Sequence, residues 1–330
     1  MTDEMVARIE EILWPDGPRQ NVWMIADGAR TVDIFRFLLD CHLEYACLYG
    51  GPLTPDLEMA APYLVQLDHG YRDTHRLIRQ AWGNSWGVFL RSDTSLKKLR
   101  RHLREFLVVR DTKGTRMVFR YYDPRVLRVY LPTCEVGELR TVFGPIECFW
   151  AEGDCREKVL EFRLHRGNLV QNTLSLATGT AHRGLPFDTT GSNRMSDGEG
   201  RAFRTLTIRN AQLAAFSQAE ARKFEDWMLL HLRQFFPGHC QSLDDQQLRQ
   251  RVAHGISRAA TYGITGKRDV CKYLQLMTVF GPDFDADQRF PWAREVLQAR
   301  KHSGMRSEAR VMALQQAALD HLREARLGEA

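Results

Sequence analysis

The hydrophobic pattern of the sequence changes after Asp154 and again at Gln212, and this limits the folds open to the chain. In the first half, short apolar runs such as residues 21–28 alternate with amphipathic stretches such as residues 31–41. From Gln212 onward, apolar residues recur at helical spacing. We therefore expect an α/β N-terminal lobe followed by an all-α C-terminal helical lobe.

Two β-rich runs surround Asp111–Thr112–Lys113–Gly114 and predict a β-hairpin. Because a hairpin is antiparallel, we expect the N-terminal lobe to hold a mixed sheet. Helices are expected after Thr31 and over Arg72–Ala81. A further helix is expected before Phe106, capped by Ser92 or Asp93.

Composition along the chain suggests three segments. Residues 1–153 are the expected α/β lobe, residues 154–211 a connector of β-strand and flexible loop, and residues 212–330 the helical domain. The connector is rich in Gly, Ser, Thr and Asn over residues 172–200, a composition that buries little apolar surface. Within the helical domain, Ser242 is expected to cap a helix.

The totals are those of a soluble globular protein of about two domains. The chain has 330 residues, of which 44% are hydrophobic and 26% charged. No apolar run approaches the roughly 20 residues that a bilayer span needs, and the N-terminus does not resemble a signal peptide. The seven cysteines are scattered without a CxxC pair, which favours free thiols in the cytoplasm.

The net charge of +5 is concentrated in part in a basic segment, residues 96–105. Such an excess could attract nucleic acid. A basic surface without interleaved aromatic residues is more often only a solvated face, and we expect no nucleic-acid partner.

The stretch FRYYDPRVL, residues 119–127, places two arginines beside an acid where a buried strand is expected to meet a helix. Asp123 followed by Pro124 fits a helix start, because the carboxylate accepts from free amides and proline suits the first turn. Arg120 and Arg125 can pair with that acid. The stretch therefore indicates a structural junction rather than an active site.

An enzymatic interpretation stays open for Asp27, which ends the first predicted strand, together with Asp123. These two acids and the basic surface could serve a hydrolase or nuclease. The phosphate-binding and nucleophile motifs GxGxxG and GxSxG are absent, as is the metal motif HExxH. We accordingly expect no enzyme, no cofactor and no metal site.

Several aromatic and charged side chains are candidates for contacts with a partner. WGNSWG contributes two tryptophans around a turn, which are more often core and hinge. The aromatic and methionine residues near 262–284 recur at helical spacing and are usually core, yet one such face could form a groove for a partner helix. The candidates are Trp82, Trp86, Arg120, Tyr122, Asp123, Arg125, Tyr262, Tyr273, Met277, Phe280 and Phe284.

Several segments in the same order resemble one known family over residues 21–152. They include NVWMIADGAR, LEYACLYGG, WGNSWGVFLRSD, VFRYYDPRVLRVYLP and FGPIECFWAE. The chain resembles the domain-of-unknown-function family 4123, whose members are adaptor-chaperones of the bacterial type VI secretion system. The resemblance implies a cytoplasmic protein that binds a toxic effector and promotes its loading onto the VgrG spike without being exported. It also implies no catalytic residues, and it leaves the client, the stoichiometry and the lobe that binds each partner open.

Overall fold

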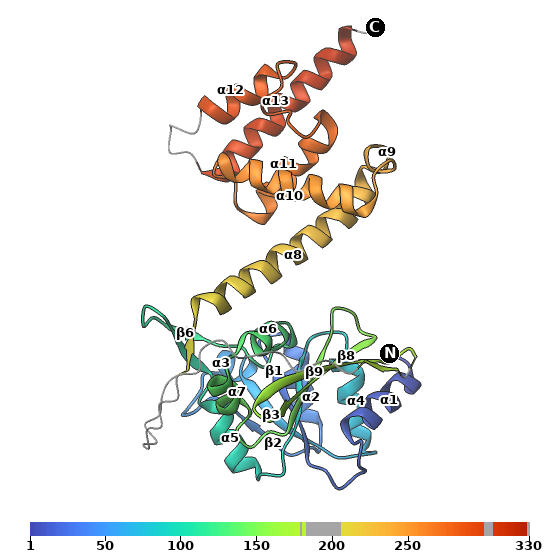
Figure 1. Cartoon of the computed structure of the whole chain (residues 1–330), viewed down its shortest axis with the longest axis vertical. Helices are drawn as coiled ribbons and strands as arrows, with labels where there is room; N and C mark the ends of the chain where they lie inside the picture. Colours follow the sequence, from blue (N-terminus) through green and yellow to red (C-terminus); the bar gives the residue numbers. More distant parts are fainter. Residues whose placement is uncertain (179, 183–205, 300–305, 329–330) are drawn as a thin grey trace. The chain divides into compact units, whose positions relative to one another are not determined.

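The computed structural model describes residues 1–178, 180–182, 206–299 and 306–328. The chain forms two compact units, Met1–Ser217 and Gln218–Ala330 (Figure 1). Much of the expected flexible loop, residues 183–200, lies outside the described residues. The first unit is α/β and the second is all helical, as the sequence predicted.

An eight-stranded sheet, antiparallel throughout, forms the centre of the first unit. Its order is β10-β9-β8-β7-β4-β1-β3-β2. The strands are β1 (Val22–Asp27), β2 (Tyr45–Cys47), β3 (Pro62–Leu67), β4 (Gly87–Arg91), β7 (Cys148–Glu152), β8 (Lys158–His165), β9 (Asn168–Ser175) and β10 (Ala181–His182). β8 and β9 fall in the expected connector, yet they extend this sheet beyond β7.

The central strands β1, β4 and β7 are buried at every position, because helices cover both faces of the sheet. Helices α1 (Asp3–Leu13), α2 (Val32–Asp40) and α4 (Arg72–Ala81) contribute to one core cluster, with Met24, Phe89 and Trp150 from the sheet. Helices α5 (Leu96–Arg104), α6 (Pro124–Tyr130) and α7 (Val136–Phe143) contribute to the other. The short helices α3 (Pro55–Met59) and η1 (Leu131–Thr133) complete this unit.

Gly87 allows β1 and β4 to pair closely at the start of β4. A Cβ atom at this position would lie 2.0 Å from the carbonyl oxygen of Ile25, so a larger residue would separate the strands. This close approach places the turn before β4 next to the end of β1.

The predicted mixed sheet is present as a small second sheet. β5 (Val108–Asp111) and β6 (Arg116–Val118) form the predicted hairpin, and β11 (Thr207–Ile208) adds to β5 in parallel. The hairpin therefore belongs to a separate sheet, and not to one mixed sheet for the whole lobe as its sequence suggests.

Local structure departs from the sequence predictions at three points. Residues 119–122 are buried in large part, but they follow the end of β6 as a turn and not as a strand. Ser95, instead of Ser92 or Asp93, is the N-cap of α5, and Asp244, instead of Ser242, is the N-cap of α10. Asp244 forms a reciprocal capping box with Gln247 and so satisfies two amides.

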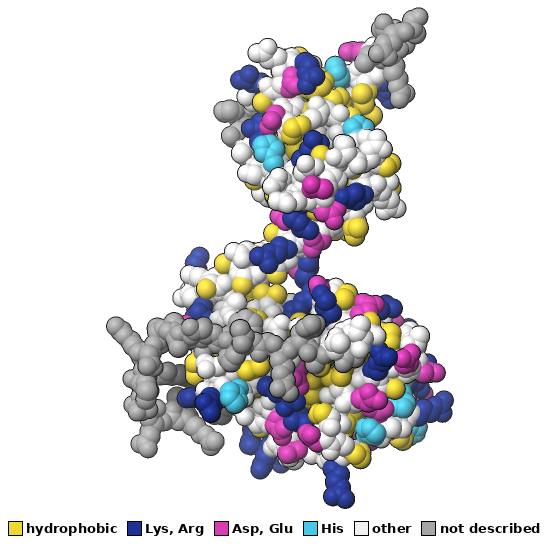
Figure 2. Space-filling view, turned by 45° about the vertical axis from the view of Figure 1, so that its right-hand side comes forward, with side chains coloured by type: hydrophobic (Ala, Val, Ile, Leu, Met, Phe, Trp, Pro, Cys, Tyr) yellow, Lys and Arg dark blue, Asp and Glu magenta, His cyan; other side chains and the backbone are white. Residues whose placement is uncertain are grey.

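The second unit packs its helices around one core. They are α8 (Asn210–Phe235, which begins in the first unit), α9 (Pro237–Cys240), α10 (Asp245–Thr261), α11 (Lys267–Phe280), α12 (Pro291–Ala299) and α13 (Ser307–Gly328). Met228, Leu232, Tyr273, Leu274 and Phe284 are central members of this core. In the space-filling view, hydrophobic side chains also reach the surface of this unit between charged ones (Figure 2).

Candidate functional site

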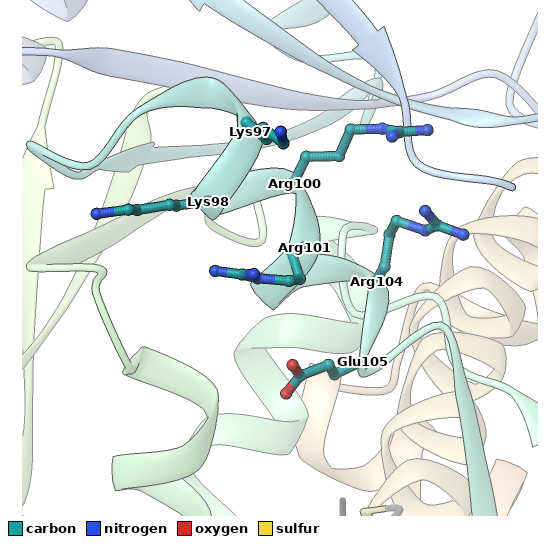
Figure 3. A pocket seen from close by; sticks show the side chains of 6 residues that line it. All are labelled: Lys97, Lys98, Arg100, Arg101, Arg104 and Glu105. Atoms are coloured by element: carbon teal, nitrogen blue, oxygen red, sulfur yellow. The ribbon is translucent and has the colours of Figure 1, made fainter.

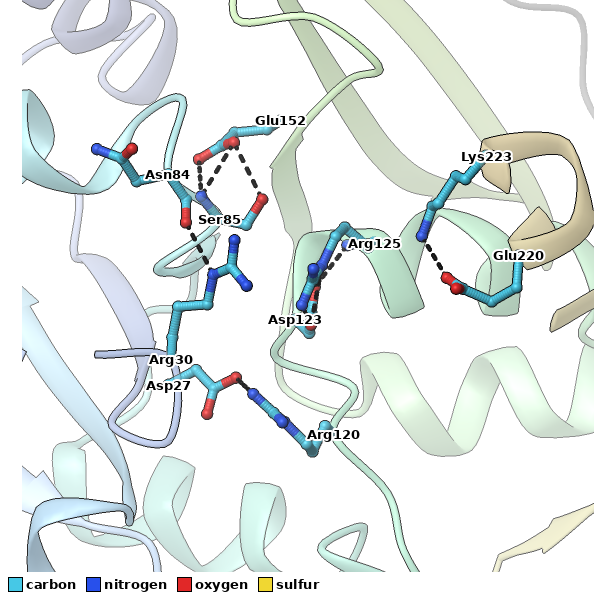
Figure 4. Close-up of polar contacts among 10 residues, drawn as sticks. All are labelled: Asp27, Arg30, Asn84, Ser85, Arg120, Asp123, Arg125, Glu152, Glu220 and Lys223. Atoms are coloured by element: carbon cyan, nitrogen blue, oxygen red, sulfur yellow. Dashed lines mark hydrogen bonds and ion pairs between the residues drawn. The ribbon is translucent and has the colours of Figure 1, made fainter. Parts of the chain in front are cut away.

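Two carboxylates lie at strand ends in the first unit, together with arginines from the FRYYDPRVL stretch (Figure 4). Asp27 ends β1 and forms an ion pair with Arg120. Asp27 is fully buried, whereas the Arg120 side chain is 39% exposed. Burial raises the pKa of Asp27, although the hydrogen bond from Arg120 opposes that shift. Arg120 therefore compensates a carboxylate that the fold has removed from water.

Asp123 begins α6 and confirms the predicted helix start. Its Oδ1 accepts hydrogen bonds from the backbone N–H and from the Nε–H of Arg125, each at 2.9 Å. Burial is the largest single influence and would raise the pKa of Asp123, but the hydrogen bonds from Arg125 and the nearby arginine charges together outweigh it and lower that pKa. Asp123 is thus a charged capping residue, engaged by the helix that it starts.

Glu152, which ends β7, supports the turn that holds the second tryptophan of WGNSWG. Both of its carboxylate oxygens accept from the backbone N–H of Ser85, at 3.2 and 3.3 Å. Ser85 has a φ of 54°, a left-handed conformation that is strained for a residue with a side chain. Burial raises the pKa of Glu152 to about 7, against the hydrogen bonds from Gly83 and Ser85.

The Glu152 contact was missed at the sequence level. Its partner lies 67 residues earlier in the chain, so no local spacing connects the two. The one available signal was an acid at the end of an otherwise apolar run, CFWAE. A carboxyl with this pKa can take up or release a proton near neutral pH.

Most of the partner candidates named from the sequence present little surface. Seven are buried: Trp82, Trp86, Tyr122, Asp123, Tyr273, Met277 and Phe284. Four are half-buried: Arg120, Arg125, Tyr262 and Phe280. The structure brings Arg120, Tyr122, Asp123 and Arg125 together at the start of α6. The candidates in the helical unit are Tyr262, Tyr273, Met277, Phe280 and Phe284. Of the buried ones, all except Asp123 belong to the hydrophobic cores.

A different set of side chains is exposed on α8 of the second unit. Trp227 is 49% exposed, Leu230 70% and Phe235 60%. The rings of Phe224, Trp227, His231 and Phe235 follow one another along the helix, with centroids 6.1, 4.8 and 4.6 Å apart. We call Phe224, Trp227, Leu230, His231 and Phe235 the α8 stripe. Met228 and Leu232, which follow Trp227 and His231 directly in the sequence, are buried and face the core.

Within the described part of the chain, no group of three or more His, Cys, Asp or Glu side chains is placed to hold a metal ion. Likewise, none of the described helices has both the length and the apolar character to cross a membrane.

No curated protein and no solved structure matches the chain. A family model does match residues 22–141, from the first residue of β1 into α7. This segment contains Asp27, Arg120, Asp123 and Arg125 but neither Glu152 nor the α8 stripe. Residues 22–141 match the sequence model of a family described as a domain of unknown function, DUF4123.

Proposed function

We propose that this protein is a non-catalytic cytoplasmic adaptor-chaperone of a bacterial type VI secretion system. It binds a toxic effector and promotes its loading onto the VgrG spike. The observation that carries the proposal is the α8 stripe, in which Trp227, Leu230 and Phe235 are exposed within nine residues of one helix. The family match over residues 22–141, and the adaptor role that the resemblance implies, support the choice of partner.

The α8 stripe has the properties of a binding surface for an apolar helix or strand. Tryptophan is among the residues most enriched at the energetic centres of protein interfaces. Exposed aromatic rings offer large contact areas and lose little side-chain entropy on binding. Since buried area does not fix affinity, such a surface can hold a client firmly and still release it at the spike.

The first unit would serve as the rigid platform of this adaptor. The charged residues of its most conspicuous motif, Asp123 and Arg125, are engaged in starting α6. Asp27 and Arg120 pair at the end of the central strand. This arrangement gives each of these side chains a structural role that requires no turnover.

Co-purification tests the proposal. The tagged chain is co-expressed with a candidate effector toxin and with the VgrG spike protein, and we expect both to be retained on the affinity resin. Trp227→Ala with Leu230→Ala should reduce toxin retention by at least about tenfold, because truncation of one tryptophan anchor alone costs about 2 kcal/mol, or roughly thirtyfold in affinity.

The matched control lies on α13 of the same unit. Met312 and Leu319 are 57% and 50% exposed, so Met312→Ala with Leu319→Ala removes comparable apolar surface elsewhere. We expect this control to retain the toxin. If the two double variants retain the toxin equally, the α8 stripe is not the binding surface. If the wild type retains neither the toxin nor the spike protein, the chain is not an adaptor.

A hydrolase or nuclease using Asp27 and Asp123 is the competing function. Asp123→Asn keeps the shape of the side chain and most of its capping capacity. Substrate turnover by the purified chain that is abolished in this variant, while toxin retention is unchanged, would favour the enzyme.

A further inference from the structure

Helix α5 exposes a concentrated positive face that the fold does not require. Lys97, Lys98, Arg101 and Arg104 are exposed, while Leu99 and Leu103 bury the opposite side in the core. Figure 3 shows Lys98 and Arg101 extending in one direction and Arg104 in another, with Glu105 as the acid beside them. We call Lys97, Lys98, Arg101 and Arg104 the α5 cationic face.

These four cations make no ion pair with any carboxylate in the described parts of the chain. The first turn of α5 holds no acid, and its lysines lie near the end of the helix dipole that disfavours positive charge. Lys97 and Arg101 are four residues apart, a spacing at which like charges repel. The last turn of the helix favours Arg101 and Arg104, so the unfavourable local energetics are those of the two lysines, and an external anion would relieve them.

The fifth cation of the helix, Arg100, is committed to the sheet. Its Nε–H donates to the carbonyl oxygen of Cys47 at 2.6 Å, and its Nη2 donates to that of Tyr49 at 3.1 Å. Arg104 packs against Gly50, and a Cβ atom added at Gly50 would lie 2.0 Å from Nη2 of Arg104. The helix is thus fixed to the end of β2, and the α5 cationic face is presented from a rigid base.

We propose that the α5 cationic face binds an acidic segment of a polypeptide partner. The charge complementarity is direct: the four cations are exposed and have no ion pair among the described residues, and they span about 10 Å of one helix, a length that a short run of carboxylates can follow. This inference rests on the proposed adaptor function, which provides the polypeptide partner.

Nucleic acid is the less suitable anion for this face. Proteins that bind single strands combine basic residues with exposed aromatic rings on which bases stack. Here the neighbouring rings turn inward, since Phe106 is buried and His102 makes a contact at 3.0 Å with the carbonyl oxygen of Val142. One short helix face is also small for a specific duplex interface, which buries roughly 1,000–2,500 Å² of protein surface.

The test measures fluorescence polarisation of a short labelled peptide of alternating Glu and Ala added to the full chain. A labelled single-stranded oligonucleotide of equal charge is measured in parallel. We expect saturable peptide binding that weakens with salt. Lys98→Glu with Arg101→Glu should weaken peptide binding by at least about tenfold, since two attractions become repulsions.

The matched control reverses two exposed charges elsewhere in the same unit. Lys113→Glu with Arg116→Glu, on the hairpin of β5 and β6, changes the net charge of the chain by the same amount as the α5 variant. We expect this control to bind the peptide within about twofold of the wild type. Equal loss in both double variants, tighter binding of the oligonucleotide, or no peptide binding would overturn the proposal. Retention of the toxin in the co-purification test is scored separately. If the chain retains the toxin but does not bind the peptide, only this inference is contradicted. If it binds the peptide but does not retain the toxin, only the adaptor function is contradicted.

Discussion

The conspicuous acids of the first unit and the aromatic residues of α8 in the second unit lie in opposite environments. In the first unit, the motif residues Asp27 and Asp123 are buried and paired with arginines. In the second, Trp227 and Phe235 remain exposed beside a complete core. The difference teaches that a conspicuous sequence motif can serve folding, while an unremarkable helix can carry the surface that is free for a partner.

The largest expected effect contrasts a core ring with a stripe ring in the helical unit. Phe284 is 1% exposed and lies 5.3 Å, centroid to centroid, from Tyr273. Phe284→Ala should lower the free energy of unfolding by about 3–5 kcal/mol, because it leaves a cavity. Trp227→Ala should cost less than about 1 kcal/mol, since half of that side chain is already in water. Chemical denaturation measures both, and similar costs would show that the stripe belongs to the core.

The next effect tests whether Arg120 compensates Asp27 in the first unit. Arg120→Ala leaves a buried carboxylate without its cation and should cost about 3 kcal/mol. Asp27→Asn in the same chain removes the uncompensated charge, so the double variant should recover part of that loss. If the losses of unfolding free energy in the two single variants simply add in the double variant, Arg120 does not compensate the charge of Asp27.

The third effect concerns pH and Glu152. Its pKa is about 7 when folded and 4.5 ordinarily, so the folded state binds more protons between these values. The free energy of unfolding should therefore fall as pH rises from 4.5 to 7, by up to about 3 kcal/mol. Glu152→Gln removes this dependence, and its melting temperature relative to the wild type should rise across that window.

The smallest effect concerns the cap of α6. Asp123→Ala removes the acceptor for the backbone N–H of Arg125 and should cost about 0.5–2 kcal/mol. Thermal melting measures it. An unchanged melting temperature with loss of toxin retention would move Asp123 from the platform to the recognition surface.

Local signals predicted much of the fold. Thr31 and Asp123 cap their helices as expected, because a cap acts on amides two or three residues away. The hairpin at Asp111–Gly114 and the all-helical second unit also followed from spacing alone. The FRYY turn did not, since its rings are buried by tertiary neighbours that are distant in sequence.

The surface residues were harder to predict than the fold. Tyr273 and Trp227 both recur at helical spacing with apolar neighbours, yet one is buried and the other is half exposed. Which face of a helix meets the core depends on the helices that pack against it, and periodicity does not specify them. For the same reason, the contact between Ser85 and Glu152 required the three-dimensional fold.

We propose that the α8 stripe, and not the paired acids of the first unit, contacts the client. Hydrogen–deuterium exchange of the full chain, with and without the bound toxin, distinguishes the two surfaces. We expect slower exchange over residues 224–235 on binding, with no change around Asp27 and Asp123. Slower exchange around those two acids, with residues 224–235 unchanged, would contradict it.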